Sequence, residues 1–130
     1  MSTIDFDRVS KRYDGRTVLS GLSLRIERGE RITIHGPSGC GKTTILRLIA
    51  GFVPPDEGVV RIGNREAAAN GRVLINPESR NLGMVFQDLA LWPHLTVYEN
   101  LEFALKAQGV SKKIREQRIG EMLARVHPLE

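Results

Sequence analysis

The chain has 130 residues, of which 41% are hydrophobic and 26% are charged, and its formal net charge is +4. This length and composition are typical of one soluble globular domain with a modest core. The single cysteine, Cys40, excludes an internal disulfide and a cysteine metal cage, and it is typical of a reducing compartment.

The first residues and the charge pattern limit the cellular location and the partners that the chain could have. No basic segment followed by an apolar one opens the chain, so no signal peptide is predicted. The most apolar window, residues 45–53, contains Arg47 and is too short to span a bilayer. Basic residues are scattered and aromatic residues make up only 5%, so nucleic acid is not an expected partner. We expect a cytoplasmic chain that reaches a membrane only through a partner.

Strands are predicted ahead of the most distinctive motif. Residues 4–13 alternate apolar and polar side chains and run into a turn at Asp14-Gly15. Residues 18–26 alternate again and end in a glycine-containing turn, and residues 31–35 are strand-like. These segments predict an antiparallel layer before the motif.

The motif has the pattern of a phosphate-binding loop. It consists of Gly36, Pro37, Ser38, Gly39, Cys40, Gly41, Lys42, Thr43 and Thr44. Glycines let the backbone approach a phosphate, and the helix predicted behind the loop offers free N–H groups and a positive dipole end. Lys42 is predicted to reach the β- and γ-phosphates, and the Thr43 hydroxyl to bind Mg²⁺.

Two alternatives concern single positions of this loop. A dinucleotide fingerprint would begin at Gly39, but Thr44 stands where its third glycine belongs. For Cys40 we expect a small space-filling role, and a redox role is the alternative. The chain is therefore predicted to bind a nucleoside triphosphate, or to descend from one that did.

The residues behind the loop predict a helix and further strands. Residues 44–50 are apolar nearly all round, which predicts a helix buried against a sheet, and Gly51 is expected to end it. A short strand is expected at 59–62. Residues 63–81 are rich in Gly, Asn, Pro and charge, which predicts loops around a small strand at 73–75.

A second candidate for the site follows an apolar run. Residues 82–86 are continuously apolar, as in a strand covered on both faces. Gln87 and Asp88 come at its carboxyl end, where ligands sit in open α/β sheets. Gln87 is predicted to meet the γ-phosphate side of the same nucleotide, and a polar strand end is the alternative.

Two helices are predicted in the remaining residues. Thr96 to Glu99 form a capping box, so a helix is expected at 97–106, ended by Gly109. A second helix is expected from residue 111. Its apolar stripe is predicted to pack in the core and consists of Ile114, Ile119, Met122, Leu123 and Val126.

Four segments in chain order match one family. They are Tyr13 at the end of Val-Ser-Lys-Arg-Tyr, residues 22–30, residues 36–44 with 46–51, and residues 85–87 with 91–100. Together they resemble the N-terminal part of the ATPase subunit of ABC transporters. A phosphate loop alone is shared by many NTPases, whereas these four matches in order are much more specific. The last stretch is most similar to importers of the polyamine, iron or sugar type.

The resemblance implies a fold and two ligands, ATP and Mg²⁺. The fold would be α/β, a P-loop NTPase core with an N-terminal antiparallel β layer and the start of a helical subdomain. Residues 1–88 would form the ATP-binding core, and residues 89–130 the beginning of the helical subdomain. Tyr13 would pack against the adenine, with an ordinary strand-end aromatic as the alternative. Gln87 would approach Mg²⁺ and the attacking water.

The same resemblance implies partners and a location. The segment after Gln87 would face the transmembrane permease subunits, and a second ATPase subunit would complete a dimer. The chain would be cytoplasmic and peripheral on the inner face of the cell membrane. Its role would be to couple ATP binding and hydrolysis to solute transport.

Three parts of the family pattern do not occur in the sequence: a Ser-Gly-Gly-Gln signature, a hydrophobic strand ending in Asp-Glu, and a switch histidine. We therefore expect an incomplete ATPase domain that hydrolyses little or no ATP by itself and has an unpaired sheet edge. The alternatives are a non-catalytic nucleotide-binding fragment and an ABC ATPase that works away from the membrane. A P-loop kinase would leave Tyr13 and the Gln87 segment unexplained.

Overall fold

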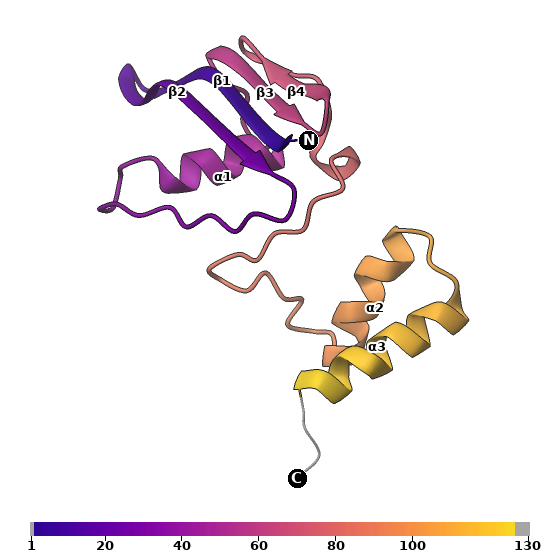
Figure 1. The fold of residues 1–130 in the computed structure, drawn as a ribbon. Coiled ribbons are helices and arrows are strands. Elements are labelled where there is room, and N and C mark those ends of the chain that lie inside the picture. Colours follow the sequence, from indigo (N-terminus) through magenta and orange to yellow (C-terminus); the bar gives the residue numbers. More distant parts are fainter. Residues whose placement is uncertain (1, 127–130) are drawn as a thin grey trace. The chain divides into compact units, whose positions relative to one another are not determined.

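The structure, a computed structural model, describes residues 2–126 and contains two compact units, Met1–Met84 and Val85–Glu130 (Figure 1). In the first unit, five antiparallel strands form a sheet in the order β2-β1-β3-β4-β5, and one helix packs against it. The elements are β1 Ser2–Tyr13, β2 Arg16–Glu27, α1 Lys42–Ala50, β3 Glu57–Ile62, β4 Arg65–Ala69, β5 Arg72–Val73 and a 3₁₀ helix, η1 Pro77–Ser79.

The core of the first unit lies between the sheet and α1. Its buried side chains are Phe6, Val9, Leu19, Leu48, Val60 and Ala68. They come from four strands and from the inward face of the helix, so the packing of these side chains holds the strands and the helix together. Burying a side chain of the size of Leu48 stabilises the fold by about 1.5–3 kcal/mol. The predicted strands at 4–13, 18–26 and 59–62, the antiparallel layer and the helix behind the loop are confirmed.

Residues 63–81 contain more strand than their composition predicts. Strands β3 and β4 are joined by the two-residue loop Gly63-Asn64, and β4 and β5 by Asn70-Gly71. Asn70 and Gly71 have φ angles of 43° and 85°, as the mirror-image turns of tight hairpins require. Both dipeptides are hairpin signals in the sequence, and they decide the local structure against the polar composition.

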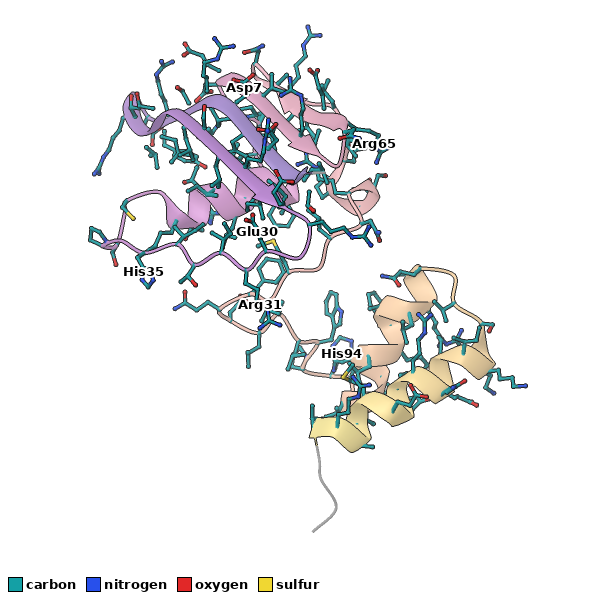
Figure 2. All side chains as sticks on the ribbon, in the orientation of Figure 1. Asp7, Glu30, Arg31, His35, Arg65 and His94 are labelled. Atoms are coloured by element: carbon teal, nitrogen blue, oxygen red, sulfur yellow. The ribbon has the colours of Figure 1, made fainter. Side chains whose placement is uncertain are left out.

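The predicted strands at residues 31–35 and 82–86 are wrong. Within the described residues, neither stretch pairs with a strand of the sheet, and both are extended without regular structure. Ile32 is 48% exposed and Val85 is 94% exposed. An apolar run predicts burial, but a strand also needs a neighbour to form a hydrogen-bonded ladder. Figure 2 shows Arg31 and His35 on this exposed stretch before the loop.

The second unit holds two helices, α2 Val97–Ala107 and α3 Lys112–Val126. The predicted capping box of α2 is confirmed. The apolar stripe of α3 is only partly buried: Ile119 is 1% exposed, whereas Met122 is 48% and Val126 is 63% exposed. The predicted core packing is therefore wrong for most of the stripe, because within the described residues the helix pair alone is too thin to cover it.

Packing divides the chain between Met84 and Val85. The boundary expected after residue 88 stays a prediction. Over residues 2–126, every helix is too short or too polar to cross a bilayer.

Candidate functional site

Residues 36–41 form a loop that leads into α1, and the loop is exposed up to Cys40. Gly41 stands directly before the helix at φ 102° and ψ 6°, a left-handed conformation that glycine adopts without strain. A Cβ atom on Gly41 would lie 3.0 Å from Leu19 Cδ2 and 3.2 Å from Val18 Cγ1. The end of the loop therefore packs closely on β2, which fixes where the helix begins.

The thiol of Cys40 lies over the start of the loop. A Cβ atom on Gly36 would come within 2.5 Å of Cys40 Sγ, and the Cys40 N–H group donates to the Pro37 carbonyl at 3.2 Å. The side chain thus fills space inside the curl of the backbone. Cys40 is an exposed free cysteine, and its space-filling role stays a prediction.

Within residues 2–126, no side chain caps the first turn of α1. Gly41 has no side chain that could accept a hydrogen bond, no other side chain caps the helix, and the first turn holds no acidic residue. The N–H groups of Lys42, Thr43 and Thr44 are left without helical acceptors. They lie at the positive end of the helix dipole. An anion is the partner that such a helix end binds.

Lys42 adds a full positive charge to this helix end. Its Nζ atom donates to the Gly36 carbonyl, which draws the side chain back along the loop. Over residues 2–126, Lys42 forms no ion pair with a carboxylate. An ammonium group held by a carbonyl alone keeps its charge available for a phosphate.

The residues present fit Mg²⁺ in one way. Thr43 is exposed in the first turn, and its hydroxyl is a hard oxygen ligand of the kind that Mg²⁺ prefers. No group of three or more His, Cys, Asp or Glu side chains in the described part of the chain could hold a metal ion. The site therefore fits Mg²⁺ as the companion of phosphate oxygens rather than in a protein cage.

Tyr13 lies at the end of the β1–β2 hairpin. It pairs with Arg16 across the hairpin, and Lys11 pairs with Leu19, the residue that touches the Gly41 position. The hairpin end therefore stands beside the phosphate loop. Tyr13 is half-buried, and its hydroxyl is buried without a hydrogen-bond partner in residues 2–126. The exposed surface of Tyr13 therefore belongs to atoms other than the hydroxyl oxygen.

The other end of α1 is closed by Arg80, a residue that the sequence did not single out. Arg80 is 3% exposed and donates from Nη1 to the carbonyls of Leu48 and Ile49, both at 3.0 Å. Its Nη2 donates to Ala67 O at 2.9 Å, and its Nε to Ile75 O at 2.8 Å. Burial lowers the pKa of the guanidinium. Arg80 thus ties the last turn of α1 to the sheet side of the unit.

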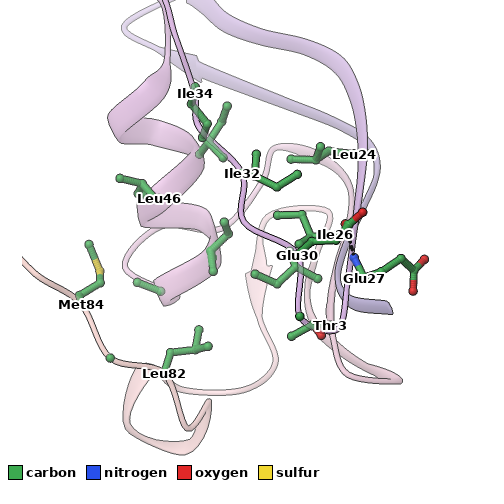
Figure 3. A pocket seen from close by; sticks show the side chains of 16 residues that line it. Thr3, Leu24, Ile26, Glu27, Glu30, Ile32, Ile34, Leu46, Leu82 and Met84 are labelled. Carbon is green, nitrogen blue, oxygen red and sulfur yellow. Dashed lines mark hydrogen bonds between the residues drawn. The ribbon is translucent and has the colours of Figure 1, made fainter. Parts of the chain in front are cut away.

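An apolar pocket of about 390 Å³ lies along the flank of α1, away from the phosphate loop. Figure 3 shows Ile32, Ile34, Leu46, Leu82 and Met84 lining it, so both stretches that do not form strands contribute. Its lining lacks the cations and free amides of the helix start. The pocket is thus not the phosphate site.

Gln87 belongs to the second unit. It is exposed and opens a turn in which Leu89 N–H donates to the Phe86 carbonyl at 3.1 Å. Leu89 and Ala90 have φ angles of 65° and 48°. The predicted role of Gln87 beside the nucleotide stays a prediction.

Comparison with known proteins places these features in one family. A family profile described as "ABC transporter" matches residues 19–129. The spermidine/putrescine import ATP-binding protein PotA of Hahella chejuensis is 48% identical over 118 residues, which are 91% of this chain and 31% of that protein. The Fe(3+) ions import ATP-binding protein FbpC 2 of Pectobacterium atrosepticum is 45% identical over 123 residues, 95% of this chain and 34% of that protein.

A solved structure agrees with these relatives. The dimeric ATP-binding cassette MJ0796, bound to ADP and Pi, has a TM-score of 0.74 at 32% identity, over 91% of this chain and 54% of that chain. This chain spans about a third of the length of the curated relatives that it matches. The antiparallel layer, the phosphate loop at α1 and these matches together show that the chain belongs to the ABC transporter family, as part of an ATP-binding domain.

Proposed function

We propose that this chain binds ATP with Mg²⁺ at residues 36–44, as part of the ATPase subunit of an ABC importer. The subunit would couple ATP binding and hydrolysis to the transport of a solute. One observation carries the proposal: the first turn of α1 has free N–H groups, no cap and a lysine without a carboxylate partner. The three features together select a multiply charged phosphate group rather than a neutral ligand.

The proposed ligand contacts follow from the chemistry of each side chain. Lys42 leaves the Gly36 carbonyl and pairs with the β- and γ-phosphates. The Thr43 hydroxyl joins the Mg²⁺ ion, which supplies charge neutralisation at the phosphates when bound. Tyr13 stacks on the adenine, and Gln87 approaches Mg²⁺ and the attacking water. Gly39 leaves room for the phosphates because it carries no Cβ atom, and nothing lies within 4 Å of where one would be.

Binding and turnover are separate properties in this proposal. Hydrolysis needs a carboxylate that holds Mg²⁺ and a group that orients the attacking water. Within residues 2–126, no group of three or more His, Cys, Asp or Glu side chains could hold a metal ion. We therefore expect the 130-residue chain to bind ATP and to hydrolyse little of it by itself.

The proposed partners are transmembrane permease subunits and a second ATPase subunit. Apolar side chains of the segment that follows Gln87 are exposed, with Leu89 at 67%, Leu91 at 63% and Trp92 at 49%. Such a row suits burial against another subunit. The cassette MJ0796 is described as dimeric, which supports a dimer here. We place the subunit at the inner face of the cell membrane.

The relatives carry names for spermidine and putrescine, for Fe(3+) ions and for osmoprotective compounds, at similar identity. We propose an importer of this group.

Isothermal titration of the chain with Mg-ATP tests the proposal. Lys42→Ala should weaken ATP binding about a hundredfold, because a charge-assisted contact with phosphate is lost. Lys113→Ala is the matched control, since Lys113 is an exposed lysine on α3 and should leave the affinity unchanged. Equal ATP affinity in the wild-type chain and Lys42→Ala would show that the loop is not the site.

A further inference from the structure

Lys11 is a buried lysine in a chain whose other lysines are more exposed. Its side chain is 10% exposed, on the strand that ends at Tyr13. Burying an ammonium group is unfavourable unless the group is paired. Two partners are present: Asp56 Oδ1 at 3.7 Å, and the Tyr13 ring, whose centroid lies 5.3 Å from Lys11 Nζ.

Asp56 fixes the same piece of backbone from the other side. Its Oδ2 atom accepts the Arg12 N–H group at 2.6 Å, and its own N–H group donates to the Ser10 carbonyl at 2.9 Å. These bonds bracket Lys11 in the sequence. The end of β1 is therefore clamped one residue before Tyr13, and Asp56 also holds the lysine charge.

The Tyr13 ring depends on this clamp because its hydroxyl does not anchor it. Tyr13 Oη is buried, and no hydrogen-bond partner for it lies within residues 2–126. The ammonium of Lys11 over the ring is the polar contact that remains. A cation over an aromatic ring is attracted to the π electrons and holds the ring in place.

The position of the pair relates it to the phosphate loop. Lys11 pairs across the hairpin with Leu19, and Leu19 is the residue that a Cβ atom on Gly41 would meet at 3.0 Å. With the ammonium on one side of the ring, a flat ligand can stack only on the other side. A ring whose π electrons are drawn toward a cation also suits the face of an electron-rich purine.

We propose that Lys11 and Asp56 are positioning residues for the nucleotide base: they hold the Tyr13 ring so that one face is presented to the purine. This inference rests on the proposed ATP site and adds two residues to it. It predicts that removing the Lys11 charge weakens recognition of the base and spares recognition of the phosphates.

The test compares two ligands that differ by the nucleoside, Mg-ATP and Mg-tripolyphosphate, on the 130-residue chain. Tyr13→Ala should reduce ATP affinity about tenfold, the size expected for loss of a base–aromatic stack, and leave tripolyphosphate affinity unchanged. Lys11→Met, which keeps an apolar stem, should reduce ATP affinity about fivefold with the same selectivity. Lys11→Arg should restore the ratio of the two affinities, and Lys113→Met is the control for a lysine lost elsewhere.

Each result decides between positioning and simpler roles. If Lys11→Met weakens both ligands equally, Lys11 acts through its charge on the phosphates, and the inference is wrong. If neither Lys11→Met nor Tyr13→Ala changes the ratio, the base does not use this ring, and the inference is also wrong. If Lys11→Met does not fold, Asp56→Asn decides instead, and an unchanged ratio there overturns the inference. In each of these cases, if Lys42→Ala abolishes the binding of both ligands, the proposal that residues 36–44 bind the phosphates still stands.

Discussion

Helix α2 begins at a closed cap, whereas helix α1 begins at a bare glycine. At α2, the Thr96 hydroxyl accepts the Glu99 N–H group at 3.1 Å, and Glu99 Oε2 accepts the Thr96 N–H group at 2.7 Å. At α1, no side chain caps the helix and the first turn holds no acid. A helix start whose donors are satisfied by the chain serves the fold. One whose donors stay open, beside a lysine that is held only by a carbonyl, is available to a ligand.

The contrast is repeated along α1 itself. The last turn is closed twice, by the Gly51 N–H group on the Arg47 carbonyl at 3.0 Å and by Arg80 on the Leu48 and Ile49 carbonyls. The helix is thus anchored at its C-terminal end and open at its N-terminal end. Anchoring one end holds the open end still, which is what a preorganised anion site requires.

Loss of the anchor should have the largest effect on stability. Arg80→Met leaves four carbonyls without their donor, two in buried and two in partly buried places, so the free energy of unfolding should fall by about 3 kcal/mol. Urea denaturation measures the change. Arg72→Met, an exposed arginine on β5, is the control and should change stability by less than about 0.5 kcal/mol. A similar small change for Arg80→Met would mean that the anchor does not hold α1.

The other contact that closes the C-terminal end of α1, at Gly51, should contribute less to stability than Arg80. Gly51 has φ 88°, and a Cβ atom there would lie 2.6 Å from Arg80 Cζ. Gly51→Ala should cost about 2 kcal/mol, from backbone strain and from displacement of the guanidinium. Gly29 has φ 85° and open space around it, so Gly29→Ala should cost only about 1 kcal/mol for the strain. Equal costs at the two glycines would mean that the contact with Arg80 adds nothing to the cost at Gly51.

Opening the cap of α2 should have a smaller and local effect. Thr96→Ala removes the acceptor of the Glu99 N–H group, and the opening free energy of that turn should fall by about 1 kcal/mol. Amide hydrogen exchange of Glu99 reads this out. Thr43→Ala at the first turn of α1 should leave exchange there unchanged without ligand, because Thr43 does not cap that helix. Equal responses would contradict the contrast between the two helix starts.

The cap of α2 should also depend weakly on pH. Hydrogen bonds from the Thr96 backbone and then the Thr96 side chain lower the pKa of Glu99. Because the folded pKa lies below the unfolded value, the contribution is present above the ordinary glutamate range and is lost as pH falls through the folded pKa. Exchange protection of the Thr96 N–H group should follow that titration. Glu99→Gln should remove the pH dependence, and an unchanged dependence would assign it to another group.

The features that the sequence predicted are those set within a few residues. The capping box at Thr96 needs only Glu99, and the phosphate loop needs only its own glycines and the helix behind it. The turn at Asp14-Gly15 is of the same kind. Each of these signals acts through local backbone geometry. The capping box and the helix behind the loop are confirmed, and phosphate binding by the loop stays a prediction.

The features that the sequence missed depend on distant or absent neighbours. Residues 31–35 and 82–86 have the composition of strands, but strand formation is decided by a partner that the described residues do not provide. Arg80 bonds to carbonyls at Leu48, Ile49 and Ala67, and carbonyls carry no sequence signal. The hairpin at Asn70-Gly71, in contrast, was within reach, because its dipeptide is a local signal that composition obscured.

We propose that the open start of α1 receives the phosphates. Titration of the isotope-labelled chain with Mg-ATP, followed through the backbone amide resonances, tests it most directly. We expect the largest shifts at the N–H groups of Gly41, Lys42 and Thr43, and none at the capped residues 97–100 of α2. Shifts of equal size at both helix starts, or saturation of binding without a change at Gly41 to Thr43, would contradict the claim.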